Sequence, residues 1–298
     1  MISERTKYVA RRIPLAYPVF LHGRGNWRNF YRRLIQVSVP HLPIKRIGGA
    51  GHAMPGELVV SLTSYPPRFH TLHLTLISLL RQAVCPDRLI LWVAKSDIHR
   101  LPPKVKKLEK YGLEIKLCDD IGSYKKIVPA LKTFPNAFIA TADDDIYYRP
   151  SWLSTLTRSY RSRPSGVICH RAHRIRLNAD GEPKNYNAWQ WDIREECESE
   201  LLVPTTGAGV LYSPGAFDER VLDEESFLTL CPTTDDIWLY WMARLNQASV
   251  RVLRGRKHLI SWAGSQASSL SNENLGEKSL NDLAVRNLSD NYGFPGKQ

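Results

Sequence analysis

Strand-like and helix-like segments alternate regularly in the first half of the chain, and this alternation is the strongest constraint on its fold. The strand-like segments are 57–65, 87–94, 113–120 and 136–145. The helix-like segments between them are 69–82, 102–112 and 123–134. This order favours right-handed crossovers and a mostly parallel sheet. The predicted fold class is therefore α/β, a mostly parallel central sheet flanked by helices.

The alternation of strand-like and helix-like segments becomes less regular after residue 148, and the boundaries of the segments are harder to place there. Helices are predicted at 151–163 and 233–245, and strand-like runs at 165–173 and 249–262. The last 30 residues are rich in Ser, Asn and Asp, and are expected to form a mobile tail or a helical lid. Within 123–134, Pro129 must either kink the helix or mark its first turn.

Positive charge is concentrated at the N-terminus. Residues 1–56 contain ten Lys or Arg and one acid, Glu4, so they supply about nine of the twelve net positive charges. We therefore expect a basic N-terminal arm, 1–56, followed by one large domain, 57–298. Within that domain, two halves are expected, 57–150 and 151–298, and the second includes the C-terminal tail.

The arm contains a short basic amphipathic helix. Trp27, Phe30, Tyr31 and Leu34 follow helical spacing beside several arginines. Such a helix can contact an anionic membrane surface, or it can pack on the domain with its arginines in solvent. No motif of a nucleic-acid reader is present, and nucleic acid is not an expected partner.

The sequence features that depend on cellular compartment favour the cytoplasm. No apolar run reaches the length of a membrane-spanning helix, and arginines interrupt the only candidate signal peptide. The five cysteines are scattered without a CxxC pair, so buried free thiols in a reducing compartment are expected. The predicted location is cytoplasmic, with peripheral contact at the inner membrane face as an option.

Three consecutive aspartates, Asp143, Asp144 and Asp145, follow the strand-like run at 136–142. Ligands of open parallel sheets bind beyond the carboxyl ends of the strands. Asp143 and Asp145 are two residues apart, and so project to the same side of an extended chain. Such a pair suits Mg²⁺ or Mn²⁺, which also take water and substrate phosphates as ligands. A solvated acidic run is the alternative.

Five motifs occur in a fixed order: SLTSYPPR, GSYKKI, TADDDIYY, TGAGV and TTDDIW. Together they resemble a GT-A glycosyltransferase, with TADDDIYY at the position of the DxD motif. The likeness is greatest to bacterial family-2-like enzymes that build surface polysaccharide, with some likeness to exostosin-type transferases. It covers about residues 57–245, and the first 56 residues have no counterpart.

The resemblance implies that 57–150 is the half that binds the nucleotide sugar and that 151–298 is the half that binds the acceptor. It also implies roles for individual residues. Those near the donor nucleotide would be Thr63, Ser64, Tyr65, Arg68, Asp119 or Asp120, Lys125 or Lys126, Asp143 and Asp144. Asp145 would ligate the metal with help from Asp143, and His258 is a candidate for a C-terminal metal ligand. Asp235 or Asp236 would face the acceptor. Lys125 and Lys126 could instead begin a solvated helix, and Tyr65 could belong to a plain turn.

An inverting transfer needs a carboxylate to take the proton of the acceptor hydroxyl, and Asp235 or Asp236 fits this role. Inversion is favoured, although a retaining transfer would need no such base. Asp235 could alternatively be a helix N-cap beside Asp236. Trp189 and Trp191 lie among amides in KNYNAWQWD, which suits a sugar as well as it suits two ordinary half-buried tryptophans.

These observations predict a metal-dependent glycosyltransferase of the hexosyltransferase class. The expected donor is a nucleoside diphosphate sugar, with a UDP-sugar as first guess, and the expected acceptor is a glycan or a lipid-linked glycan. One alternative is a sugar-nucleotide nucleotidyltransferase, although SLTSYPPR lacks the glycines of its usual phosphate loop. A non-catalytic glycan- or membrane-binding module is the other.

Overall fold

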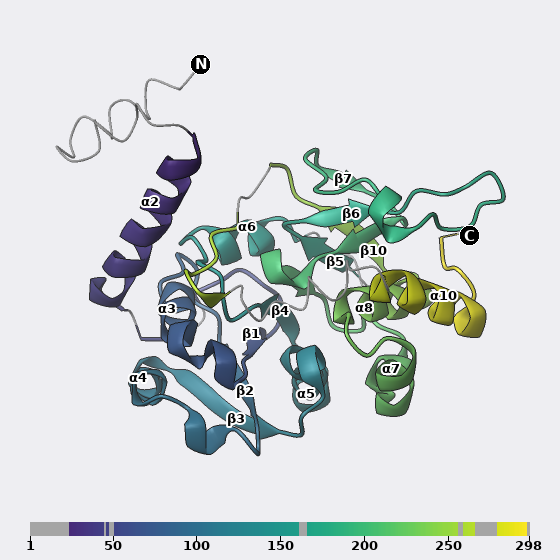
Figure 1. Cartoon of the computed structure of the whole chain (residues 1–298). Coiled ribbons are helices and arrows are strands. Elements are labelled where there is room, and N and C mark those ends of the chain that lie inside the picture. Colours follow the sequence, from purple (N-terminus) through teal and green to yellow (C-terminus); the bar gives the residue numbers. More distant parts are fainter. Residues whose placement is uncertain are drawn as a thin grey trace.

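The structure is a computed structural model that describes residues 24–44, 46–47, 51–160, 166–255, 259–265 and 279–296. A large sheet runs through the centre, with helices on both faces (Figure 1). The elements up to the end of β4 are α2 (Arg24–Ser38), η2 (Val39–His41), β1 (Leu58–Thr63), η3 (Pro66–Arg68), α3 (Phe69–Leu79), β2 (Arg88–Ala94), η4 (Ile98–Arg100), α4 (Pro103–Lys106), η5 (Lys107–Tyr111), β3 (Leu113–Cys118), η6 (Gly122–Lys126), α5 (Val128–Thr133) and β4 (Phe138–Ala142).

The second half contains shorter strands and longer loops. Its elements are α6 (Trp152–Arg158), β5 (Gly166–Cys169), β6 (Ala172–Arg174), η7 (Tyr186–Ala188), β7 (Cys197–Glu198), β8 (Leu202–Pro204), η8 (Thr206–Ala208), β9 (Val210–Tyr212), η9 (Glu219–Leu222), α7 (Glu224–Leu230), α8 (Asp235–Leu245), β10 (Ser249–Val252) and α10 (Leu280–Tyr292).

The central sheet has eight strands in the order β3-β2-β1-β4-β9-β5-β10-β7. The four strands of the first half are mutually parallel, with Val60 opposite Leu89 on one side and Ala140 on the other. Strand β9 runs antiparallel to both β4 and β5 and joins the two halves. The predicted fold class, a mostly parallel sheet flanked by helices, is confirmed.

Alternation along the strands divides the core into two layers. Val59 of β1 packs with Ile139 and the helix α8 on one face. Its neighbours Leu58, Val60 and Leu62 pack with α3, α4 and α6 on the other. Successive side chains of a strand point to opposite faces, so an almost wholly apolar strand is stable only when both faces are covered.

Several element boundaries differ from the sequence prediction. The run at 123–134 is a 3₁₀ turn, η6, followed by α5, and Pro129 lies in the first turn of α5. That position suits proline because the first N–H groups of a helix have no partner within it. The run at 249–262 forms a strand only over Ser249–Val252. Near the C-terminus, α10 packs against α7 and α8.

Helix α2 of the basic arm is held against the domain by one face. Arg32 donates from Nη2 to the backbone oxygen of Trp262 (3.1 Å), and the side chain of Gln36 accepts from the N–H of Ala263 (3.0 Å). Within the described ranges, no helix combines the length and the apolar character needed to cross a lipid bilayer.

Candidate functional site

A cavity of about 580 Å³ opens at the carboxyl ends of β1 and β4. Residues after β1 and β4, in η6 and η8, and at the start of α8 form its walls. It is lined by twelve of the residues singled out from the sequence: Thr63, Ser64, Tyr65, Arg68, Asp120, Lys125, Lys126, Asp143, Asp144, Asp145, Asp235 and Asp236.

Two other singled-out residues are not among those that line the cavity. The side chain of Asp119 is 78% exposed and pairs with Lys95 at 2.8 Å. Of the alternatives Asp119 and Asp120, only Asp120 therefore reaches the cavity. His258 lies outside the residues that the structure describes.

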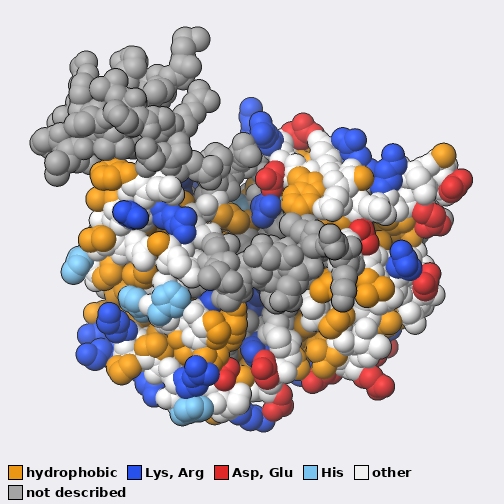
Figure 2. All heavy atoms as spheres, viewed as in Figure 1, with side chains coloured by type: hydrophobic (Ala, Val, Ile, Leu, Met, Phe, Trp, Pro, Cys, Tyr) orange, Lys and Arg blue, Asp and Glu red, His pale blue; other side chains and the backbone are white. Residues whose placement is uncertain are grey.

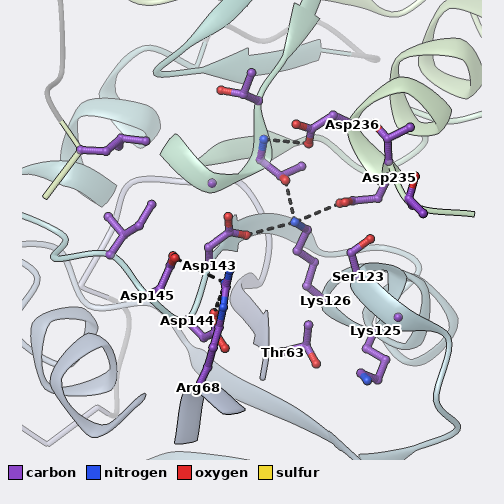
Figure 3. A pocket seen from close by; sticks show the side chains of 18 of the residues that line it. Thr63, Arg68, Ser123, Lys125, Lys126, Asp143, Asp144, Asp145, Asp235 and Asp236 are labelled. Atoms are coloured by element: carbon purple, nitrogen blue, oxygen red, sulfur yellow. Dashed lines mark hydrogen bonds and ion pairs between the residues drawn. The ribbon is translucent and has the colours of Figure 1, made fainter. Parts of the chain in front are cut away.

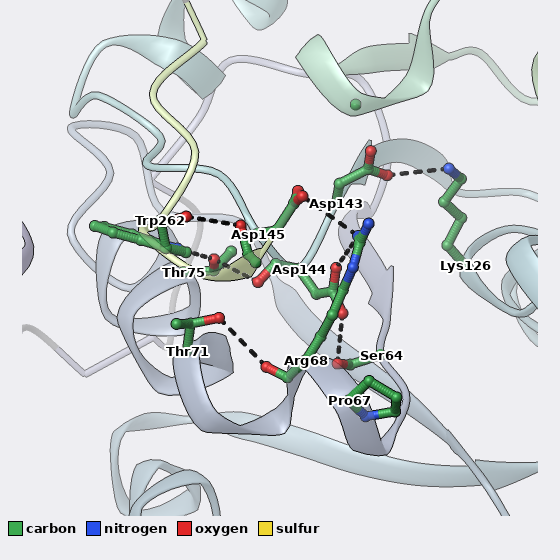
Figure 4. Close-up of polar contacts among 12 residues, drawn as sticks. Ser64, Pro67, Arg68, Thr71, Thr75, Lys126, Asp143, Asp144, Asp145 and Trp262 are labelled. Atoms are coloured by element: carbon green, nitrogen blue, oxygen red, sulfur yellow. Dashed lines mark hydrogen bonds and ion pairs between the residues drawn. The ribbon is translucent and has the colours of Figure 1, made fainter. Parts of the chain in front are cut away.

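Asp144 is buried, as Asp145 is, and both of its carboxylate oxygens have hydrogen-bond partners within the protein. One carboxylate oxygen accepts from the hydroxyl of Ser64 at 2.5 Å, and the other accepts from Arg68 Nη1 at 2.8 Å (Figure 4). Burial raises its pKa, whereas Arg68 and Ser64 oppose that shift. Both oxygens of Asp144 are thus engaged within the protein, which leaves Asp143 and Asp145 to act on a ligand.

Arg68 supplies the positive charge beside the aspartates on the β1 side. Its Nη1 is 3.4 Å from a carboxylate oxygen of Asp145, in addition to its bond to Asp144. Burial alone would lower the pKa of Arg68, but the charges of Asp144 and Asp145 raise it overall. The guanidinium therefore stays charged and fixes the conformation of the loop.

Asp143 is held from its backbone and from its side chain. Its N–H donates to the hydroxyl oxygen of Tyr148 (2.8 Å), and that hydroxyl donates to the backbone oxygen of Gly207 (2.8 Å). A Cβ atom at position 207 would overlap a carboxylate oxygen of Asp143. A side chain at position 207 would therefore push the carboxylate of Asp143 out of its present position.

Lys126 joins the two sides of the cavity. Its ammonium group contacts Asp143 (3.0 Å), the hydroxyl of Thr206 (2.6 Å) and Asp235 (3.0 Å), as Figure 3 shows. Burial would lower its pKa, but the charges of Asp143 and Asp235 raise it overall. The contact with Asp235 is an ion pair and not a hydrogen bond, because this Asp235 oxygen has no hydrogen-bond partner among the described residues. Lys126 therefore orients side chains on both sides of the cavity.

Lys125 has a different environment from its neighbour. Its ammonium group pairs with Asp120, whose side chain is 60% exposed at the cavity. The pKa of Asp120 is lowered, first by the hydrogen bond from Lys125. Of the two lysines, Lys125 is the one whose partner is accessible to solvent and to a ligand.

Asp235 and Asp236 begin helix α8 and differ in accessibility. The N-cap is Thr234, so Asp235 is not the cap, and its side chain turns to Lys126 instead. Asp236 is half-buried, and one of its oxygens accepts from the N–H of Thr206 (2.9 Å). Burial and then the charge of Asp235 raise the pKa of Asp236 to about 6, against the opposing charge of Lys126.

Sequence reasoning missed two residues that hold this arrangement together. Thr206 donates from its backbone to Asp236 and accepts from Lys126 on its side chain. Tyr148 bonds to both Asp143 and Gly207. The TGAGV and DDDIYY motifs contain them, but neither motif indicates which partner lies across the sheet. Of the two tryptophans, Trp191 lines the cavity whereas Trp189 is buried.

The carboxylates of the cavity suit a divalent cation only when a bound ligand completes the coordination of that cation. Among the described residues, no group of three or more His, Cys, Asp or Glu side chains is arranged to hold a metal ion. Mg²⁺ and Mn²⁺ need only one or two carboxylates when phosphates complete their coordination. The described lining has six carboxylates against four Lys and Arg side chains, an excess of two negative charges that would oppose a bare diphosphate.

Comparisons with known proteins give structural matches only. No family model matches the chain, and no curated protein matches it either. TarS 1-349 from S. aureus is similar over 79% of this chain and 72% of its own, with 15% identity and a TM-score of 0.47. A 4-diphosphocytidyl-2C-methyl-D-erythritolsynthase from Anaerococcus prevotii matches over 67% of this chain and 87% of its own, with 15% identity and a TM-score of 0.42.

A third match is the mannosyltransferase PcManGT from Pyrobaculum calidifontis in complex with GDP-Man and Mn²⁺. It covers 48% of this chain and 42% of its own, with 13% identity and a TM-score of 0.32. All three TM-scores lie below 0.5, so these matches carry no argument about the function of this chain.

Proposed function

We propose that the chain is a metal-dependent glycosyltransferase. It moves a sugar from a nucleoside diphosphate donor to a glycan or lipid-linked acceptor, as in surface polysaccharide synthesis. One observation supports this most. Asp143 and Asp145 lie at the sheet edge in the same cavity as Asp236, a half-buried carboxylate whose pKa is raised to about 6. A cation site for phosphates and a base for a hydroxyl would thus share one cavity.

The donor would bind on the side of the cavity formed by residues 57–150. Thr63, Ser64 and Tyr65 line this side, and Thr63 is fixed by its hydroxyl bond to the backbone oxygen of Trp92 (2.9 Å). Asp120 and Lys125, which also line the cavity, would contact the base and the ribose. The half formed by 151–298 contributes Asp235 and Asp236 and would receive the acceptor.

Asp145 and Asp143 would hold the Mg²⁺ or Mn²⁺ together with the donor diphosphate. When bound, the cation supplies positive charge that stabilises the departing nucleoside diphosphate. Asp144 and Arg68 keep Asp145 in place, and Lys126 and Gly207 do the same for Asp143. The residues of this chain thus orient both carboxylates before the donor arrives.

The transfer would proceed with inversion, with Asp236 as the base. Asp236 takes the proton of the acceptor hydroxyl while that oxygen forms a bond to the anomeric carbon of the donor. The bond between that carbon and the diphosphate oxygen breaks, and its electron pair leaves with the nucleoside diphosphate. Asp235 is the less suitable base, because it is buried and paired with Lys126.

A nucleotidyltransferase remains the second candidate, because it would use a similar sheet and metal. Such enzymes bind phosphates with the backbone N–H groups of a glycine-rich loop after the first strand. Here β1 is followed by η3, which contains Pro66 and Pro67. Neither proline has an N–H to offer, so this turn is poorly suited to hold a triphosphate.

Nucleotide binding is expected to require both a metal and Asp145. Titration calorimetry would measure UDP, GDP and CMP, each with Mn²⁺ and with EDTA. Loss of an outer-shell partner typically costs about 10–100-fold in metal affinity, so Asp145→Ala should weaken binding by at least about 100-fold. The matched control is Asp119→Ala, which removes an exposed aspartate outside the cavity and should bind as the wild type does. Absence of metal-dependent binding by any nucleotide would refute the proposal.

The arm would hold the enzyme at an anionic membrane surface, at the cytoplasmic face. Tyr31, Leu34 and Val37 on α2 are 41%, 40% and 68% exposed, and Arg33 beside them is exposed too. Figure 2 shows hydrophobic and basic side chains together over this helix. Apolar side chains flanked by cations suit the interface of an anionic bilayer.

Vesicle co-sedimentation would test the membrane contact. We expect binding to vesicles containing phosphatidylglycerol, weak binding to phosphatidylcholine alone, and loss of binding at high salt. The double variant Leu34→Ser, Val37→Ser should bind at least about tenfold more weakly, because each buried apolar side chain contributes on the order of 1.5–3 kcal/mol. Leu228→Ser, at an equally exposed leucine on α7, is the control. Equal binding by the double variant and the control would contradict the proposal.

A further inference from the structure

One end of the cavity is made by residues that the donor and the base do not use. Strand β6 contributes His173, the η7 turn contributes Tyr186, the loop after it contributes Trp191, and the start of α10 contributes Asn281. The N–H of Tyr186 donates to the carboxylate of Asp282 at 2.6 Å, which ties α10 to η7. These segments therefore form one continuous wall.

Trp191 is partly open to the cavity and is held by its neighbours. Its side chain is 38% exposed, among the few exposed large apolar residues in the described chain. The ring lies 4.8 Å from the ring of His173 and 5.4 Å, edge to face, from that of Tyr186. An indole fixed in this way can stack on the apolar face of a sugar ring with little loss of side-chain entropy.

His173 is a neutral donor at this wall. Its Nδ1 accepts from the N–H of Asp192 (3.1 Å), so the ring proton is on Nε2. Burial, and then the charge of Arg171, lowers the pKa of His173 to about 4, so the ring is uncharged at neutral pH. Among the described residues, none accepts a hydrogen bond from Nε2. A ligand hydroxyl could do so.

Asp192 holds this geometry through a strained backbone. Its φ is +53°, a left-handed conformation that non-glycine residues rarely adopt. From this conformation its N–H reaches His173 while its carboxylate pairs with Arg171. Such strain persists only where the surroundings impose it, and it concentrates at ligand sites.

Asn281 contributes an unpaired acceptor. The residue is 5% exposed, and its side-chain oxygen has no hydrogen-bond partner among the described residues. A buried polar atom without a partner costs on the order of 1–3 kcal/mol, so such atoms are rare in folded proteins. A hydroxyl group bound in the cavity would satisfy it.

The charges at this end disfavour an anion. His173 is neutral, and the charge of Arg171 is compensated by Asp192. Burial raises the pKa of Tyr186, and the negative charge of Asp236, which lines the same cavity, raises it further. A carboxylate or phosphate on the ligand would meet that negative charge without a free cation among these residues.

We propose that this wall is a subsite for an uncharged sugar ring of the acceptor. Trp191 stacks on the ring, His173 Nε2–H donates to one hydroxyl, and the side-chain oxygen of Asn281 accepts from another. That the sugar is an acceptor rests on the proposed function; that the wall binds a neutral saccharide does not. The subsite lies in the same cavity as Asp236 and the aspartates 143–145.

Saturation-transfer NMR would test the subsite directly. The probes are the methyl glycosides of glucose, galactose, mannose and N-acetylglucosamine, with methyl glucuronide as the charged comparison. We expect at least one neutral glycoside to bind, with transfer strongest to the protons of its apolar face, and methyl glucuronide to bind at least fivefold more weakly. Trp191→Leu should abolish the signal, and Asn281→Ala should weaken binding about tenfold, the value of one well-formed hydrogen bond.

Unfolding temperatures separate binding from folding. Asn281→Ala removes an acceptor without a protein partner, so its Tm should match that of the control Leu283→Ala on the same helix, which should bind as the wild type does. The inference is overturned if no neutral glycoside binds the wild type or if the glucuronide binds best. It is also overturned if Trp191→Leu and Asn281→Ala both bind the glycosides as the wild type does. Failure of metal-dependent nucleotide binding alone would overturn the enzyme proposal and leave the saccharide subsite standing.

Discussion

Replacing Asp236 with Asn is expected to lower kcat by about 10²–10⁴-fold, the usual contribution of a general base. Metal-dependent nucleotide binding should be unchanged, because Asp236 belongs to the half that is proposed to receive the acceptor. The amide oxygen can still accept from the N–H of Thr206, so the fold should be retained. Stopped assays of transfer, with calorimetry of the nucleotide on the same protein, would measure both. A fall of less than tenfold would exclude Asp236 as the base and favour a retaining transfer.

The pH profile provides an independent check on the same residue. The base must be ionised, and the pKa of Asp236 is raised to about 6. Consequently kcat/KM should rise tenfold per pH unit below about pH 6 and level off above it. Removing the negative charge in Asp235→Asn should stabilise the ionised form of Asp236 and move this limb to lower pH. A limb that stays in place, or that moves to higher pH, would contradict the assignment.

Replacing Lys126 with Met is expected to cause the largest loss of stability. It would leave Asp143 and Asp235 without their shared buried cation, and removing one partner from a buried ion pair costs about 3–5 kcal/mol. Lys125→Met is the matched control, since its partner Asp120 is 60% exposed and can be hydrated. That change should cost only on the order of 1 kcal/mol. Urea unfolding of the two variants side by side would give the difference.

The pH range of this effect follows from the direction of the shift. The folded-state pKa of Lys126 is raised above the usual 10.5, so its stabilising contribution is complete below about pH 10.5 and is lost only as the pH rises through the folded-state value. The gap between the two variants should therefore be constant from pH 7 to 9. Equal stability of the two variants would show that the bridging role is wrong.

The sheet and its acidic edge could be predicted because the signals are local. Each parallel strand of the first half is a long apolar run, and residues after such strands must meet at one edge. The position of Asp143, Asp144 and Asp145 follows from that rule alone. The different roles of the three aspartates could not be predicted. What distinguishes Asp144 is its hydrogen bonds from Ser64 and Arg68, which lie about 80 residues earlier in the chain.

The other side of the site depends on contacts that no local pattern contains. Strand β9 has three residues, and nothing in its sequence indicates that it pairs with both β4 and β5. That pairing brings Thr206 to Lys126 and Asp236. Lys125 and Lys126 are adjacent and chemically identical, and only the geometry of η6 gives them different partners. Trp189 and Trp191 differ for a similar reason, because the conformation of their loop buries Trp189 and leaves Trp191 at the cavity.

The antiparallel strand β9 also determines how the cavity can move. Its ladders to β4 and β5 join the half formed by residues 57–150 and the half formed by residues 151–298 within one hydrogen-bonded sheet. A hinge between the two halves would have to break those ladders, at Ile139–Tyr212 and its neighbours. The separation of the donor aspartates from Asp236 is therefore preorganised by the fold. Any closure over the substrates must come from loops at the rim and not from rotation of one half against the other.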